Sequence, residues 1–177
     1  MERAAEIIAR HLFEEEDMNL FCVLDGASIP DLLDRLYNCE LEYECLYRGE
    51  LQPDMAEVAP YLVLLEEDSD MTRWVIEKGW GHHWGVFARS SEGLRSLRRH
   101  FRRFLTVHDS NAKPLYFRYY DPRVLRVYLP TCNPGELAEL FGPIDRYLME
   151  DEDGRGILSF RNNSGVLAQA RVEVKED

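Results

Sequence analysis

The chain has 177 residues, of which 45% are hydrophobic and 11% are aromatic, and its formal net charge is −12. This length suits a single domain, with one lobe or two, and this apolar content excludes a disordered chain. The acidic balance argues against nucleic acid as a partner, because most of the surface would repel phosphate.

The sequence also argues against a membrane or secreted protein. The apolar run at 61–65 meets charge after five residues, far short of the ~20 that a membrane span needs. The N-terminal string MERAAEIIARHLFEEED is acidic and amphipathic, unlike a signal peptide. The four cysteines, at positions 22, 39, 45 and 132, form no CxxC pair, so we expect reduced thiols. We therefore expect a soluble, cytoplasmic protein with no membrane partner.

Charge is unevenly distributed along the chain. The net charge is −15 over residues 1–70, +8 over 71–131 and −5 over 132–177. Of the 21 basic residues 18 are arginine, whose planar fork favours specific pairing with carboxylates. The asymmetry indicates either a charged partner or an internal match between the acidic and basic regions, and the arginine content favours protein contacts.

The residues up to 90 alternate between helical and strand-like patterns. Ala5, Ile8 and Leu12 share one face of the first helix, and Gly79 is placed to end the third. Helices are predicted at 2–16, about 30–38 and 71–79, and strands at 20–26, 43–49, 61–65 and 84–90.

Beyond residue 90 the clearest pattern is a helix at 92–105, whose apolar residues recur at spacings of three and four. The stretch 115–130 reads as strand on both sides of a break at Asp121-Pro122. A helix at 133–142 begins with the residues of a capping box, and the strings RYLME, GILSF and VLAQARVEV predict a β-rich close.

This alternation predicts a mixed α/β fold, in which a mixed sheet is covered by helices. We expect an N-terminal helix over 1–19, a main domain over 20–150 and a β-rich C-terminal extension of the same domain over 151–177.

The string GWGHHWG (79–85) has the composition of a reactive centre. An extended backbone at 82–84 would point His82 and His83 to opposite faces, so that they could not grip one metal ion together. No further ligands stand at a zinc spacing, and the glycines follow a helix instead of preceding one, unlike a phosphate loop. We expect no metal and no cofactor, and a turn whose Trp80 and Trp84 anchor its ends in the core.

Asp121 and Arg123 allow two interpretations, a charged catalytic pair or a turn in which Arg123 pairs with Asp121. No serine or cysteine nucleophile stands in a recognisable elbow, and no third group completes a triad in the sequence. Asp-Pro is also an ordinary chain break, so we favour the structural turn.

Five arginines form a stripe on the helix at 92–105, and we call them the arginine stripe: Arg95, Arg98, Arg99, Arg102 and Arg103. Glu92 is the only acid between 91 and 108, so pairing within the helix cannot neutralise them. Their partners must come from elsewhere in the fold, with the acidic residues 1–70 as candidates, or from another molecule. We expect some of them to contact a protein partner.

Seven strings occur in order along the chain: FCVLDGASIPDLLDRL, YECLYRGEL, APYLVLLE, TRWVIEKGWGHHWGVFARS, LRRHFRRFLTV, FRYYDPRVLRVYLPT and FGPIDRYLME. Over about residues 20–150 they closely resemble the effector adaptor family of the type VI secretion system, the Tap/TEC-type chaperones, long catalogued as a domain of unknown function. The resemblance assigns five positions to family motifs with structural roles: Trp80, Trp84, Tyr120, Asp121 and Arg123.

The resemblance implies a non-enzymatic bacterial adaptor of the cytoplasm, with residues 20–150 as its adaptor domain. Such proteins bind the N-terminal region of a cognate toxic effector and help to load it onto the VgrG spike protein. Two other functions remain open. One is an immunity-like inhibitor, whose acidic residues 1–70 would cover a basic toxin, and the other is a small hydrolase or transferase using Asp121, Arg123 and either His82 or His83.

Overall fold

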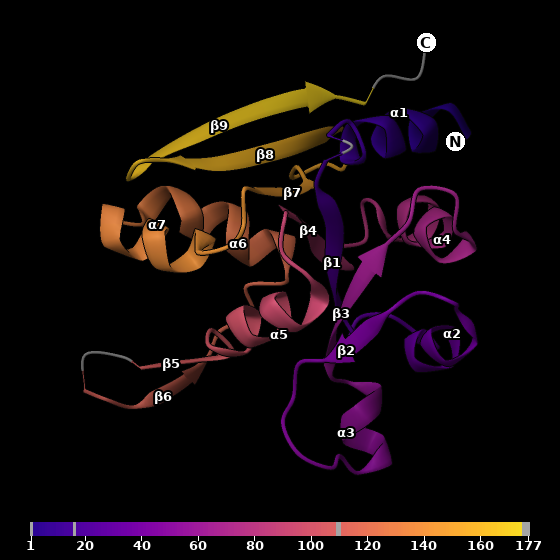
Figure 1. Cartoon of the computed structure of the whole chain (residues 1–177), viewed down its shortest axis with the longest axis horizontal. Helices are drawn as coiled ribbons and strands as arrows, with labels where there is room; N and C mark the ends of the chain where they lie inside the picture. The colour runs from indigo at the N-terminus through magenta and orange to yellow at the C-terminus, as the bar shows by residue number, and fades with distance from the viewer. Residues whose placement is uncertain (1, 16, 109–110, 175–177) are drawn as a thin grey trace.

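The computed structural model describes residues 2–15, 17–108 and 111–174 (Figure 1). In these residues a seven-stranded sheet has the order β2-β3-β1-β4-β7-β8-β9. Its strands are β1 (Asn19–Asp25), β2 (Tyr43–Cys45), β3 (Pro60–Leu65), β4 (Gly85–Ser90), β7 (Arg146–Glu150), β8 (Gly156–Asn163) and β9 (Val166–Glu173). A separate hairpin pairs β5 (Thr106–His108) with β6 (Pro114–Tyr116).

The helices are α1 (Glu2–Leu12), α2 (Leu32–Asn38), α3 (Pro53–Glu57), α4 (Asp70–Gly79), α5 (Leu94–Arg102), α6 (Pro122–Tyr128) and α7 (Pro134–Phe141). A short 3₁₀ helix, Leu129–Thr131, continues α6. The predicted α/β class is therefore confirmed. Within the described residues, every helix is too short or too polar to cross a bilayer.

The sheet differs from the expected mixed sheet, because every neighbouring pair of its strands is antiparallel. Two helix-containing connections do join strands that run the same way, β1 to β2 through α2 and β3 to β4 through α4. In each case, however, one antiparallel strand lies between the two. This interleaving is the split βαβ arrangement of ferredoxin-like folds, here extended by β7, β8 and β9 beyond β4.

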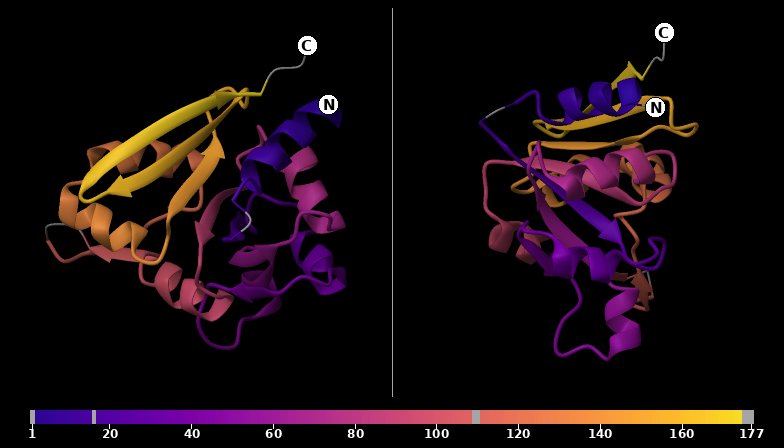
Figure 2. Two further views of the ribbon diagram at one scale, coloured as in Figure 1. Left: turned by 45° about the horizontal axis from the view of Figure 1, so that its top comes forward. Right: turned by 90° about the vertical axis from the view of Figure 1, so that its right-hand side faces the viewer.

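Two layers of helices cover the two faces of the sheet (Figure 2, left). Side chains of β1 alternate between the faces: Phe21 and Val23 join the core under α5, α6 and α7, whereas Cys22 and Leu24 join the core under α1, α2 and α4. Burial on both faces explains why the central strand reads as a continuous apolar run.

The stretch 115–130 is the main error of the sequence-based prediction. Its strand β6 ends at Tyr116, and the residues after Pro122 form a helix instead of a second strand. The Asp121 side chain accepts a hydrogen bond from the backbone N–H of Arg123, and Pro122 occupies the first turn of the helix, where no N–H is needed. Leu125 and Leu129, four residues apart, are buried together. The aromatic and β-branched residues of this stretch favour strands, and they led to the strand prediction despite the helical spacing of Leu125 and Leu129.

By contrast, the capping box of α7 is confirmed. The Asn133 side chain accepts from the backbone N–H of Glu136 (2.9 Å), and the Glu136 side chain accepts from the backbone N–H of Asn133 (2.8 Å). These reciprocal bonds satisfy two donors that the first turn of a helix leaves unpaired.

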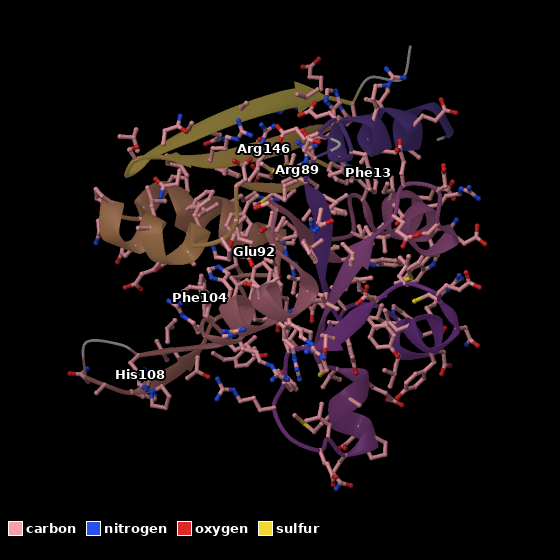
Figure 3. All side chains as sticks on the ribbon, viewed as in Figure 1. Phe13, Arg89, Glu92, Phe104, His108 and Arg146 are labelled. Atoms are coloured by element: carbon pink, nitrogen blue, oxygen red, sulfur yellow. The ribbon has the colours of Figure 1, made fainter. Side chains whose placement is uncertain are left out.

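The N-terminal helix α1 ends at Leu12, earlier than the predicted residue 16, and its end is held by Arg89 of β4 (Figure 3). Arg89 donates to the carbonyl oxygen of His11 and to that of Leu12, the latter from Nε at 3.1 Å and from Nη2 at 2.8 Å. Its Nη1 lies 3.4 Å from carboxylate oxygens of Glu14 and Glu15. The guanidinium therefore replaces the hydrogen-bond donors that the last turn of α1 lacks.

Part of the charge asymmetry is matched internally. Glu15 pairs with Arg146 (2.7 Å) and with Arg161 (3.1 Å), and Arg161 also pairs with Asp145 (2.7 Å). Acids just after α1 thus meet arginines of β4, β7 and β8.

His100 of α5 is a buried neutral histidine. Its Nε2 lies 2.9 Å from the carbonyl oxygen of Leu140 in α7, and burial lowers its pKa to about 4. Because this value lies below the ~6.5 of an exposed histidine, unfolding takes up a proton at acidic pH. The contribution of His100 to stability is complete above about pH 6.5 and is lost as the pH falls from there towards 4.

We therefore expect the free energy of unfolding to fall by about 2 kcal/mol from this group alone between pH 7.5 and pH 5. Urea unfolding of the wild type and of His100→Gln at both pH values measures the effect, because glutamine can donate to the same carbonyl but does not titrate. An equal pH dependence in both proteins would contradict the assignment.

Candidate functional site

Four segments that lie far apart in the sequence meet at one end of the sheet. β1 ends in Asp25, whose backbone N–H donates to the carbonyl oxygen of Trp84, just before β4 (2.9 Å). β7 ends in Glu150, which contacts the turn at 79–84. The guanidinium of Arg123, at the start of α6, interacts electrostatically with both Asp25 and Glu150. We call these groups the charged cluster: Asp25, Arg118, Asp121, Arg123 and Glu150.

The turn at 79–84 folds around the carboxylate of Glu150. Gly81 and His83 have left-handed backbone conformations, with φ of 82° and 60°. Their backbone N–H groups donate to the two carboxylate oxygens of Glu150 at 2.5 and 3.1 Å, and His83 Nδ1 lies against the same carboxylate. The expectation that 82–84 is extended is therefore wrong, because β4 begins only at Gly85. His82 is exposed on the turn, away from this contact.

The contact between His83 and Glu150 raises the question of a metal centre. Across residues 2–15, 17–108 and 111–174, no three or more His, Cys, Asp or Glu side chains are grouped so that they could hold a metal ion. Both groups instead shape the turn.

Trp80 and Trp84 lie at the two ends of this turn. Both are half-buried and pack against the core under α1, α2 and α4. Trp80 Nε1 donates to the carbonyl oxygen of Gly154 (3.0 Å). The ring centroid of Trp84 lies 4.6 Å from that of Trp74. A Cβ added at Gly79 would lie 2.8 Å from the Trp84 ring, so the indole packs directly on the helix end.

Asp121 and Arg123 form the structural pair that the sequence favours. Asp121 is buried, accepts from the Arg123 backbone N–H at 2.9 Å, and pairs with Arg123 Nη2 at 2.7 Å. Burial raises the pKa of Asp121, but the hydrogen bonds from Arg123 outweigh it, so the pKa lies below its ordinary value. The neighbouring Tyr120 is buried in the core under α5, α6 and α7, and its hydroxyl lies 3.4 Å from that of Tyr116.

Asp25 is a member of the cluster that the sequence did not single out. It is buried, pairs with the guanidinium of Arg118, and accepts from Ser28 Oγ (2.6 Å). A Cβ at Gly26 would lie 2.4 Å from the carbonyl oxygen of Ala59, so Gly26 allows a close backbone approach. The sequence contains a pattern that could have indicated this role, an aspartate and a glycine at the end of a buried strand. The same pattern is equally typical of a simple turn.

The arginine stripe divides into two sets. Arg98 and Arg102 are half-buried against the 44–47 segment: Arg98 Nε lies 3.3 Å from Glu44 Oε2, and Arg102 donates to the three carbonyl oxygens of residues 45–47 at 2.5–3.0 Å. The other three, Arg95, Arg99 and Arg103, are exposed. The structure thus uses two of the five arginines within the fold, one of them with an acid of residues 1–70.

The chain matches, over residues 20–139, the sequence model of a family described as a domain of unknown function, DUF4123. This match spans more than half of the chain, and the protein belongs to that family. No curated protein and no solved structure gives a significant match. The matched region runs from the second residue of β1 into α7, so it contains the turn at 79–84 and every member of the charged cluster except Glu150.

Proposed function

We propose that the protein is a non-enzymatic adaptor in the bacterial cytoplasm, which binds the N-terminal region of a type VI secretion effector and helps to load it onto the VgrG spike. One observation carries the proposal. In the motifs that resemble the adaptor family, the charged side chains hold the backbone, or one another, in place. Asp121 caps α6 and Glu150 fixes the turn at 79–84. Because these ionisable side chains stabilise the fold, the observation favours a scaffold that presents a surface for binding.

The alternative of a hydrolase would require these groups to be available for chemistry. Both carboxylate oxygens of Asp121 accept hydrogen bonds from Arg123, and these bonds hold the pKa of Asp121 below its ordinary value, which makes it a weaker base. His83 lies against a carboxylate that also receives two backbone N–H groups. Asp121 and Arg123 would each have to give up a fold-stabilising contact before they could act, which favours the adaptor.

The immunity-like inhibitor has one observation in its favour. A groove of about 680 Å³ between α2 and the start of α4 is lined by five carboxylates: Glu40, Glu66, Glu67, Asp68 and Asp70. Such a surface fits a basic partner. The adaptor and inhibitor proposals differ in what loss of the protein does to the cell, and a deletion experiment separates them.

We expect the tagged chain, co-expressed with the products of its neighbouring genes, to co-purify with a large effector through that protein's N-terminal region and with VgrG. Deleting the gene should abolish delivery of this effector into a target cell, because the effector can no longer be loaded. Restoring the gene from a plasmid should restore delivery.

The controls are delivery of an unrelated effector by the same cells and their survival when the cognate toxin is expressed inside them. Unchanged delivery of the cognate effector after deletion would contradict the adaptor proposal. Sensitivity of the deletion strain to its own toxin would favour the inhibitor.

A further inference from the structure

A surface groove lies where the α2–α3 side of the molecule approaches the β5–β6 hairpin. Its volume is about 650 Å³, and its walls come from five residues of the segment before and within α3, from the C-terminal end of α5 and from the hairpin. The five are Leu46, Tyr47, Arg48, Leu51 and Met55. Figure 1 shows α3 and the hairpin extending to the same side of the molecule, on either side of α5. We call this the hairpin groove.

The groove exposes apolar side chains on both walls. Met55 of α3 is 44% exposed and Tyr116 of β6 is 49% exposed, while Leu51 and Tyr47 between them are half-buried. Exposed apolar groups that face one another across a groove are a common feature of protein-binding surfaces.

The hairpin wall is joined to the segment that lies between the two walls, so this side of the groove is preformed. The Tyr116 hydroxyl donates to the Tyr47 hydroxyl at 2.8 Å, and the two rings meet edge to face at 6.2 Å. Tyr120 extends this chain of hydroxyls towards the charged cluster, with its hydroxyl 3.4 Å from that of Tyr116. A partner that binds here would therefore lose little affinity to ordering of the hairpin wall.

The lining of the groove is positively charged. Among the described residues that line it are three arginines, Arg48, Arg102 and Arg103, and no Asp or Glu. Arg102 donates to neutral carbonyl oxygens, and Arg103 lies over the ring of Phe104, so neither contact supplies a negative charge. The nearby Glu44 pairs with Arg98. The lining thus keeps an excess of positive charge on an otherwise acidic protein.

The shape of the complementary partner follows from these contacts. Addition of a β-strand beside β2 is disfavoured, because the carbonyl oxygens of residues 45–47 already accept hydrogen bonds from Arg102. An amphipathic helix needs no backbone partners and can insert one apolar face between the walls. Carboxylates on its flanks would face Arg48 and Arg103.

We propose that the hairpin groove binds an acidic amphipathic helix of the partner protein, with apolar side chains between Met55 and Tyr116 and carboxylates on Arg48 and Arg103. This inference rests on the proposed adaptor function for the identity of the partner, an effector segment, but not for the chemistry of the helix.

Two matched peptides of about 18 residues, or about 27 Å of helix, test the chemistry of the groove. Both carry leucine on one helical face, and the remaining positions are mainly glutamate in one peptide and lysine in the other. Fluorescence anisotropy with the full chain should show saturable binding of the glutamate peptide, weakening as salt rises, and binding of the lysine peptide at least about tenfold weaker.

Arg103→Glu and Met55→Glu should each weaken binding of the glutamate peptide by about tenfold or more, because one reverses a charge and the other places a charge on the apolar wall. Arg95→Glu is the matched control, since Arg95 is an exposed arginine in the first turn of α5 and does not line the groove. The affinity of this variant for the glutamate peptide should stay within about twofold of the wild type. Arg48→Glu, in an exposed loop, replaces either groove variant that fails to fold. Equal affinity for both peptides, or undiminished binding by the groove variants, would overturn the inference.

Co-expression with the effector then tests the identity of the occupant. A groove variant that loses both the peptide and the effector supports the inference, whereas one that loses the peptide but still co-purifies with the effector overturns it. If the wild type binds no effector at all, the proposed function fails, and the peptide measurements still decide whether the groove recognises an acidic helix.

Discussion

Replacing Arg89 by methionine is expected to lower the free energy of unfolding by about 3–5 kcal/mol, the range observed when one partner of a buried charged contact is removed. Only 1% of the Arg89 side chain is exposed, and its guanidinium donates to the last two carbonyl oxygens of α1. Methionine fills the volume of the aliphatic stem but supplies no donor, so these carbonyl oxygens lose their partner in a buried place.

Urea unfolding measures the loss, and hydrogen exchange of the α1 amides locates it. Arg73→Met is the matched control, because Arg73 is exposed and pairs with Asp70, which is exposed as well. We expect the control to change stability by less than about 0.5 kcal/mol. If Arg89→Met costs less than about 1 kcal/mol and α1 stays protected, water or Arg146 can take over the role of Arg89.

The role of Arg89 also joins two parts of the chain. α1 precedes the family-matched region 20–139, whereas Arg89 lies inside that region, on β4. The helix is thus attached to the family domain by one buried side chain, in addition to the apolar contacts of Ile8 and Leu12.

Local sequence signals predicted the elements whose cause is itself local. The capping box at Asn133 and the apolar spacing of α5 each depend on residues within one or two helical turns, and both are confirmed. The failure at 115–130 has a local cause as well. Aromatic and β-branched residues favour strands in general, but the cap at Asp121 and the burial of Leu125 and Leu129 stabilise a helix.

The geometry of the candidate site could not be predicted in the same way, because its contacts span the chain. The carboxylate of Glu150 accepts hydrogen bonds from the backbone N–H groups of Gly81 and His83, which lie almost 70 positions earlier in the sequence. Arg102 reaches the carbonyl oxygens of residues 45–47 across a similar interval. Nothing in the order of the sequence indicates which carboxylate or carbonyl a given charged side chain will meet.

The high arginine content has a physical explanation that the sequence suggested only in part. Carboxylate pairing was expected, and it occurs at Asp25, Glu44 and Asp121. Several arginines instead donate to backbone carbonyl oxygens, as Arg89, Arg102 and Arg126 do. The fork of an arginine can satisfy more than one carbonyl at once, which lysine does less well. Arginine therefore also supplies hydrogen bonds to the backbone carbonyl oxygens that remain unpaired at the ends of short helices and strands.

The second large effect is expected at Trp84. Replacing it by alanine should cost about 3 kcal/mol, the lower end of the range for large aromatic side chains, because the indole is half-buried. The ring packs between Trp74 and the end of α4 and holds the turn at 79–84 on the core. Tyr37→Ala is a control for the loss of an aromatic side chain, since Tyr37 is 68% exposed, and it should cost much less.

A double-mutant cycle with Gly79 tests the contact itself. The three atoms nearest to a Cβ at Gly79 all belong to Trp84, at 2.8–3.2 Å, and the backbone of Gly79 is that of an ordinary helical residue. In the wild type, Gly79→Ala should therefore destabilise by about 1–3 kcal/mol, because the indole must move. In the Trp84→Ala background the same substitution meets no ring, and it should be neutral or stabilise by up to about 1 kcal/mol, since alanine favours a helix over glycine. Thermal and urea unfolding of the four proteins measures this reversal of sign. An equal cost of Gly79→Ala in both backgrounds would show that the glycine is required for a reason other than the tryptophan.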